Sequence, residues 1–113
     1  MVICPCSMGT LGRIAAGTSD STILRAADVF LKERRKLVLA VRESPLSEIH
    51  LENMLKLSRM GAVIMPPLPA FYTRPQSLDD VVNHTVARLL DQFGIDAPGL
   101  TRWNGEMGTG GED

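Results

Sequence analysis

The chain lacks the features that would set it apart from ordinary globular proteins. Its two cysteines are too few for a disulfide framework, and aromatic residues make up only 4% of its 113 residues. The formal net charge is −1, which gives no overall attraction to nucleic acid or to a membrane surface. No apolar run is as long as a membrane-spanning helix, which needs about 18 residues. The first residues lack the basic-then-apolar layout of a signal peptide, so the cytoplasm is the expected location.

The cysteines, Cys4 and Cys6, lie in the apolar start of the chain. In a strand, residues two apart point to the same face. A metal site would need further soft ligands, and only His50 and His84 are available, without ligand-like spacing. We expect buried free thiols and no metal, with a metal or redox role as the alternative.

The order of apolar segments predicts an α/β domain. Short apolar runs predict strands at 1–5, 37–41 and 62–65. The second run is apolar throughout, which is typical of a strand buried on both faces. Apolar periodicity predicts helices at 8–16, 22–35, 48–60 and 78–93. The resulting order β-α-α-β-α-β-α favours right-handed crossovers and a parallel sheet. The first strand is expected to end at Pro5.

Serines and glycines mark the ends of the predicted helices. Caps are expected at Ser21, Ser47 and Ser77, with Asp80 completing a capping-box-like start, and Gly61 suits a left-handed helix end. Three helices carry apolar stripes on a helical period: Ile23, Ala26, Ala27, Phe30 and Leu31 on the second, Leu51, Met54 and Leu55 on the third, and Val81, Val82, Thr85, Val86, Leu89, Leu90 and Phe93 on the fourth.

Three loops follow the predicted strands and should open at the same edge of the sheet, where ligands of α/β proteins bind. The first contains Ser7, Met8, Gly9 and Thr10 and opens a helix. Unpaired backbone N–H groups and the helix dipole at such a point favour a phosphate. An ordinary helix cap is the alternative.

The second and third loops add charge and an aromatic tip. Arg42 offers a planar fork suited to phosphate, and Glu43 beside it is a candidate proton donor. An ion pair between them at the sheet edge is the alternative. The third loop, 66–75, is stiffened by four prolines and carries Phe71 and Tyr72. A proline-rich docking segment is its alternative interpretation.

Three further residues could serve a site or merely the surface. Arg25 and Lys32 lie seven residues apart on one helix, hence on one face, and a solvated face is the usual explanation. Arg88, on the last predicted helix, would ordinarily be surface or packing, as would Trp103. The polar, glycine-rich tail 107–113 is expected to be disordered, which leaves a domain at 1–106.

Five motifs, in order along the chain, resemble those of the UbiX-type flavin prenyltransferases. They occupy 5–11, 25–35, 42–46, 61–67 and 69–72, within a resemblance that runs from Met1 to Trp103. The resemblance implies a flavodoxin-like domain, three layers with helices on both faces of a parallel sheet, that binds FMN. It also implies a large homo-oligomer with sites at subunit contacts.

The implied reaction joins a dimethylallyl group from dimethylallyl monophosphate to N5 and C6 of reduced FMN, without a metal. The prenylated FMN then serves UbiD-type decarboxylases, including one in ubiquinone biosynthesis. Two alternatives remain open at this point. One is a non-catalytic FMN-binding or assembly subunit, and the other is a related flavin-dependent decarboxylase.

The resemblance also implies a role for each matched position. Five residues match the FMN site: Ser7, Met8, Gly9, Thr10 and Arg42. Four match the grip on the prenyl phosphate, Arg25, Lys32, Tyr72 and Arg88, and Trp103 matches an aromatic near it. Glu43 matches the carboxylate that assists departure of the phosphate. The family's initial Gly-Ala-Ser-Gly-Ala-type loop is not found in this sequence. We therefore expect the C-terminal portion of the domain, with N-terminal strands missing.

Overall fold

The computed structural model describes residues 1–96, which belong to two compact units. The N-terminal unit is Met1–Leu68, and the C-terminal unit is Pro69–Asp113, described as far as residue 96. Trp103, the tail 107–113 and the predicted domain end at 106 lie outside the described residues.

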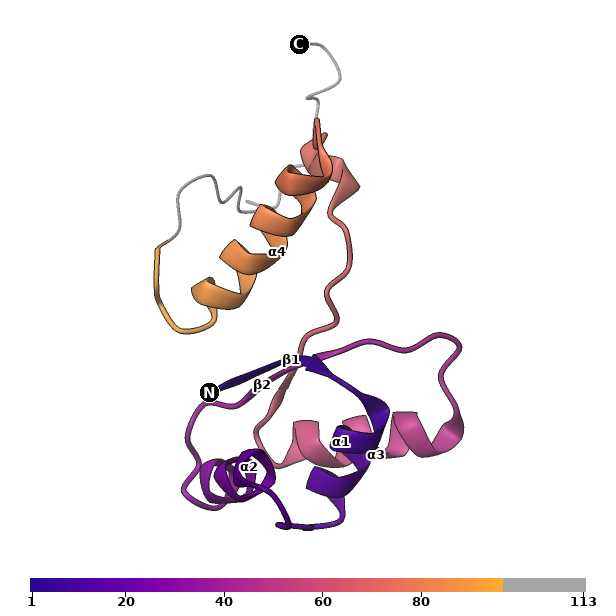
Figure 1. The fold of residues 1–113 in the computed structure, drawn as a ribbon, viewed down its shortest axis with the longest axis vertical. Coiled ribbons are helices and arrows are strands. Elements are labelled where there is room, and N and C mark those ends of the chain that lie inside the picture. The colour runs from indigo at the N-terminus through magenta and orange to yellow at the C-terminus, as the bar shows by residue number, and fades with distance from the viewer. Residues whose placement is uncertain (97–113) are drawn as a thin grey trace. The chain divides into compact units, whose positions relative to one another are not determined.

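A parallel sheet organises the N-terminal unit (Figure 1). Its elements are β1 (Val2–Cys6), α1 (Met8–Ala15), α2 (Thr22–Lys32), β2 (Val38–Val41), α3 (Glu48–Arg59) and β3 (Val63–Ile64). The strand order is β1-β2-β3, with Val2 opposite Val38 and Leu39 opposite Ile64, and both pairs are parallel. The predicted element order and the predicted parallel sheet are confirmed.

The three helices of this unit lie on the same side of the strands, as Figure 1 shows. The strand order advances in one direction without reversal, and crossovers of one hand then place every connecting helix on the same face. Helices on both faces were expected. Within the N-terminal unit that expectation is wrong, because a second helical layer requires a reversal of strand order that β1, β2 and β3 do not contain.

The core lies between the sheet and these helices. Leu37, Leu39 and Val41 join Leu11, Leu24, Leu57 and other apolar residues of α1, α2 and α3 in one buried cluster. Val38 and Ala40, which alternate with them, lie outside that cluster but are also fully buried. The prediction of a strand buried on both faces is therefore confirmed for β2.

Serine caps begin each of the four α-helices within residues 1–96. The hydroxyl oxygens of Ser7, Ser21, Ser47 and Ser77 accept hydrogen bonds from backbone N–H groups three residues on, at 3.1, 3.2, 3.2 and 3.1 Å. Asp80 does not complete the predicted box, because its carboxylate accepts from Gln76 N at 2.8 Å. Gly61 adopts the expected left-handed conformation, with φ of 101°. The helix predicted to reach residue 35 ends at Lys32, and Arg34 turns the chain with φ of 55°.

β1 differs from its prediction at Pro5. The strand continues through Pro5 to Cys6, with an irregularity of register between Ile3 and Cys6. A proline is tolerated in a strand at such a bulge, because its missing N–H is not needed for pairing there. The bulge also breaks the two-residue alternation, so Cys6 is buried while Cys4 is exposed. The expectation that both thiols are buried on one face is wrong for Cys4.

The C-terminal unit is much less buried in the part that the structure describes. It contains a short 3₁₀ turn, η1 (Phe71–Thr73), and α4 (Leu78–Asp91). Ala87 is the one buried apolar residue between residues 69 and 96, although α4 has the predicted apolar stripe. Within residues 1–96 no helix has the length and apolar character needed to cross a membrane.

Candidate functional site

The carboxyl edge of the sheet brings the first two predicted loops together. Cys6 at the end of β1 lies opposite Val41 at the end of β2. Because the strands are parallel, the next residues, Ser7 and Arg42, leave the same edge from neighbouring strands. The sequence-based placement of these two loops at one edge is confirmed.

The first loop is both a helix cap and a set of hydrogen-bond donors. Ser7 Oγ accepts from Thr10 N at 3.1 Å and donates to Thr10 Oγ1 at 3.0 Å, and Leu11 N donates to Ser7 O at 2.8 Å. The N–H groups of Met8 and Gly9, at the first two positions of α1, have no acceptor within a helix. They lie at the positive end of the helix dipole, where an anion is stabilised. The cap is confirmed, and phosphate binding stays a prediction.

Arg42 and Glu43 are both exposed at the end of β2. Glu43 Oε1 accepts a hydrogen bond from Ser44 N at 3.0 Å, which fixes the carboxylate by a local contact. Within residues 1–96 Arg42 has no hydrogen bond or ion pair, so the alternative of a simple ion pair at the sheet edge is not realised. The guanidinium is therefore available to a ligand.

Tyr72 lies in the C-terminal unit and contacts a residue that sequence reasoning missed. Its ring meets the His84 ring edge-on, with centroids 6.3 Å apart and planes at 89°. Arg88 follows His84 by four residues on α4, so the two lie on one helix face. In the sequence, His84 stands out only as a possible metal ligand. No spacing in the sequence indicates a contact between a residue of η1 and one inside α4.

Arg25 and Lys32 are exposed on α2. Arg25 Nε donates to Ser19 O at 3.2 Å, which holds the side chain beside the α1–α2 turn. Seven residues of helix separate the two cations by about 10 Å. Lys32 ends α2 shortly before β2 begins, and so lies toward the opposite end of β2 from Arg42. A single copy of the N-terminal unit does not bring Lys32 to Arg42.

The thiol at the base of the carboxyl edge is inert. Burial raises the pKa of Cys6 from 9.0 to about 11, because the thiolate would lose its hydration. Such a thiol stays protonated near neutral pH and is a poor nucleophile. In the described part of the chain, no group of three or more His, Cys, Asp or Glu residues could hold a metal ion.

The parallel sheet and its connecting helices place the chain among the α/β proteins, in which ligands bind at the carboxyl edge of the sheet. Within that class, the chain belongs to the Flavoprotein family, whose model matches residues 1–90.

Individual relatives narrow the similarity. A "Probable UbiX-like flavin prenyltransferase" of Streptomyces sp. (strain D7) is 61% identical over 105 residues, which are 93% of this chain and 52% of that protein. A crystal structure of AnUbiX (PadA1) in complex with FMN and dimethylallyl pyrophosphate matches with a TM-score of 0.89 and 55% identity, over 94% of this chain and 56% of that one. The dodecameric FMN-dependent UbiX-like decarboxylase of Escherichia coli O157:H7 matches with a TM-score of 0.88 and 61% identity, over 93% and 57%.

These similarities agree with the predicted resemblance to UbiX-type flavin prenyltransferases. The chain spans about half the length of the curated relatives it matches. The shares of length do not support the narrower expectation of a C-terminal portion, which stays a prediction.

Proposed function

We propose that the chain provides flavin prenyltransferase chemistry, the transfer of a dimethylallyl group from dimethylallyl monophosphate to N5 and C6 of reduced FMN. One observation carries the proposal: Ser7 and Arg42 directly follow the ends of two adjacent parallel strands, within motifs that resemble this family. The relative bound to FMN and dimethylallyl pyrophosphate, at 55% identity, supports FMN and a dimethylallyl phosphate ester as the ligands, and the monophosphate is chosen from the family resemblance.

The donor set at the carboxyl edge fits FMN. The Thr10 hydroxyl, the N–H groups of Met8 and Gly9, and the Arg42 guanidinium offer donors and positive charge, and the Ser7 hydroxyl holds the Thr10 hydroxyl in place by donating to it. Such a set suits an anionic, acceptor-rich ligand. In this proposal these five residues hold FMN, and reduced FMN when bound supplies the nucleophilic N5 and C6.

The prenyl phosphate is assigned to a second group of residues: Arg25, Lys32, Tyr72, Arg88 and, outside the described residues, Trp103. Lys32 and Arg42 lie toward opposite ends of β2 in one copy. We therefore propose that the site is completed across a subunit contact, with Arg25 and Lys32 contributed by a neighbouring copy. A homo-oligomer is part of this proposal, supported by the dodecameric relative at 61% identity.

Glu43 is proposed as the proton donor. Negative charge grows on the phosphate as the bond to the dimethylallyl group breaks, and the cations and the Tyr72 hydroxyl stabilise that charge. The contact from Ser44 N to Glu43 Oε1 leaves Oε2 to carry the proton given to the departing oxygen. The prenylated FMN would then pass to a UbiD-type decarboxylase. A cytoplasmic location and a role in ubiquinone biosynthesis belong to the same proposal.

Two other functions have some support. The hydrogen-bond donors at the carboxyl edge would serve a non-catalytic FMN-binding or assembly role equally well. The similarity to a protein described as an FMN-dependent decarboxylase favours direct decarboxylation instead.

The test supplies the chain with dimethylallyl monophosphate and FMN, reduced and kept free of oxygen, and measures prenylated FMN by mass spectrometry. We expect product, and we expect Glu43→Gln to slow its formation by about 10²- to 10⁴-fold. Glu48→Gln, an exposed carboxylate in the first turn of α3, is the matched control and should keep the rate.

Three other results would redirect the proposal. A full rate in Glu43→Gln would remove its role as proton donor. FMN binding without product would favour the non-catalytic role, and release of carbon dioxide from an added aromatic acid would favour the decarboxylase.

A further inference from the structure

Large apolar side chains are exposed along α3. Ile49, Leu51 and Leu55 are 69%, 52% and 51% exposed, whereas Leu57 on the opposite face is fully buried. The stripe of Leu51 and Leu55 noted in the sequence therefore points away from the core of its own unit. A Leu on the surface is common, but a row of them along one helix indicates a surface that another molecule covers.

The charges on α3 are divided between its two halves. Glu48 and Glu52 lie in the first half, and Lys56 and Arg59 lie in the second. Neither the Glu52 nor the Arg59 side chain has a hydrogen bond or ion pair among residues 1–96. The face therefore presents an acidic end, an apolar middle and a basic end.

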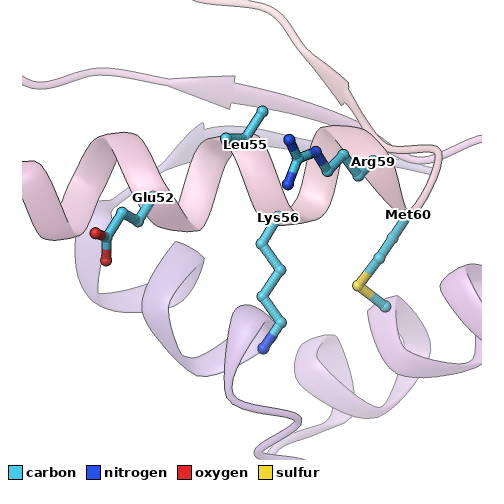
Figure 2. Close-up of a pocket in the computed structure, with 5 residues that line it drawn as sticks. All are labelled: Glu52, Leu55, Lys56, Arg59 and Met60. Carbon is cyan, nitrogen blue, oxygen red and sulfur yellow. The ribbon is translucent and has the colours of Figure 1, made fainter.

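Figure 2 shows a pocket on α3 that is lined by Glu52, Leu55, Lys56, Arg59 and Met60. Leu55 extends to one side of the helix and Lys56 and Met60 to the other, while Arg59 runs along the helix toward Leu55. The apolar Leu55 thus lies between charges of opposite sign at successive turns.

We infer that this face binds the same face of a second copy of the chain, with the two α3 helices antiparallel. A surface that carries an acidic and a basic end on one helix is complementary to itself when turned around, as a twofold contact requires. Leu55 is three residues from Glu52 and four from Arg59, which places it near the midpoint. A twofold axis at Leu55 then sets Glu52 of each copy against Arg59 of the other.

The distances suit this arrangement. Glu52 and Arg59 are separated by about 10 Å along the helix, and packed helices lie about 8–10 Å apart. Both long side chains reach across such a gap, while Leu55 fills the middle of the contact and Leu51 lies beyond Glu52 at each end. The inference rests on the homo-oligomer proposed above for its choice of partner, but it is independent of the prenyl-transfer chemistry.

The geometry is tested by cross-linking in a Cys4→Ser background, which removes the exposed native thiol. Leu55→Cys places two thiols at the twofold axis, within the about 3.5–4.5 Å between Cβ atoms that a disulfide needs. We expect mild oxidation to convert most of the chain to a covalent dimer. Ile23→Cys, on the similarly exposed surface of α2, is the matched control and should stay mostly uncross-linked. An oligomeric chain in which Leu55→Cys cross-links no faster than Ile23→Cys overturns the inference.

Charge reversal tests the pairing by sedimentation equilibrium. Arg59→Glu should weaken the association at least about 10-fold, because it opposes two carboxylates across the contact. Glu52→Arg combined with Arg59→Glu should restore it, and Lys36→Glu on the exposed α2–β2 loop should have no effect. Failure of the double variant to recover contradicts the antiparallel register. A wild-type chain that sediments at the monomer mass of 12.3 kDa contradicts both this contact and the proposed homo-oligomer, while prenyl transfer would remain separately testable.

Discussion

The two units of the chain use similar helices to different ends. In the N-terminal unit, the eleven-residue α2 buries Leu24, Ala27 and Leu31. In the C-terminal unit, the fourteen-residue α4 buries only Ala87, although apolar residues recur along it at helical spacing. Apolar residues at helical spacing therefore predict a helix with an apolar stripe, but they do not predict that the same unit covers the stripe.

The largest expected effect is a difference between the two units in how much a truncated leucine lowers the free energy of unfolding. Leu57→Ala on α3 removes a fully buried side chain and should cost about 2–5 kcal/mol, because it leaves a cavity in the core. Leu78→Ala on α4, where the side chain is 77% exposed, should change the free energy of unfolding by less than about 0.5 kcal/mol. Urea denaturation of both variants measures this, and equal losses would remove the contrast between the units.

The helix caps sharpen the same comparison at smaller cost. Ser21→Ala and Ser77→Ala each remove one hydroxyl acceptor at a helix start, worth about 1 kcal/mol. For α2, packed in the core, we expect the loss to appear as lower global stability. For α4, we expect it chiefly as faster amide hydrogen exchange within that helix. Faster exchange throughout the N-terminal unit of Ser77→Ala would show that the units open together.

The ring contact in the C-terminal unit is expected to have a comparable or smaller effect. His84→Ala should release the edge-on contact with Tyr72, worth about 0.5–1.5 kcal/mol, whereas His84→Phe should preserve it. Tyr72 is the only tyrosine, so its ring proton shifts in NMR spectra report the change directly. Unchanged shifts in His84→Ala would mean that the contact does not position the ring.

The smallest expected effect is a difference in thiol reactivity between Cys4 and Cys6, which lie in the same strand. At about pH 8, a thiol reagent should label the exposed Cys4 well before Cys6, whose pKa is raised to about 11 by burial. The folded chain holds the Cys6 proton to a higher pH than the unfolded chain does. The contribution of Cys6 to stability should therefore be constant below pH 9.0 and fall as the pH rises toward about 11. Equal labelling rates, measured by mass spectrometry, would contradict the buried placement.

Much of the N-terminal unit follows from local sequence signals. The serine caps, the glycine at the end of α3 and the fully apolar run of β2 are local features, and all three predictions are confirmed. The shared edge of Ser7 and Arg42 also follows from the sequence, because parallel strands joined by crossovers end on the same side.

The rest depends on contacts between distant residues. The bulge in β1 changes which cysteine faces the core. Pro5 is compatible either with a bulge or with the end of the strand, and only the pairing with β2 decides between the two. The buried face of α3 carries Leu57, whereas Leu51 and Leu55 lie on the opposite, exposed face; the sequence has apolar residues on both faces, and only packing selects between them. The separation of Lys32 from Arg42 depends on where β2 begins and ends.

The central claim is that the edge formed by Ser7 and Arg42 holds the anionic flavin. Titration of FMN against the wild-type chain, Arg42→Met and the control Arg13→Met, followed by flavin fluorescence, tests it most directly. Loss of a charge-assisted contact of about 1.5–3 kcal/mol predicts weakening by about 10- to 100-fold in Arg42→Met alone. Equal affinity in all three proteins would contradict the claim.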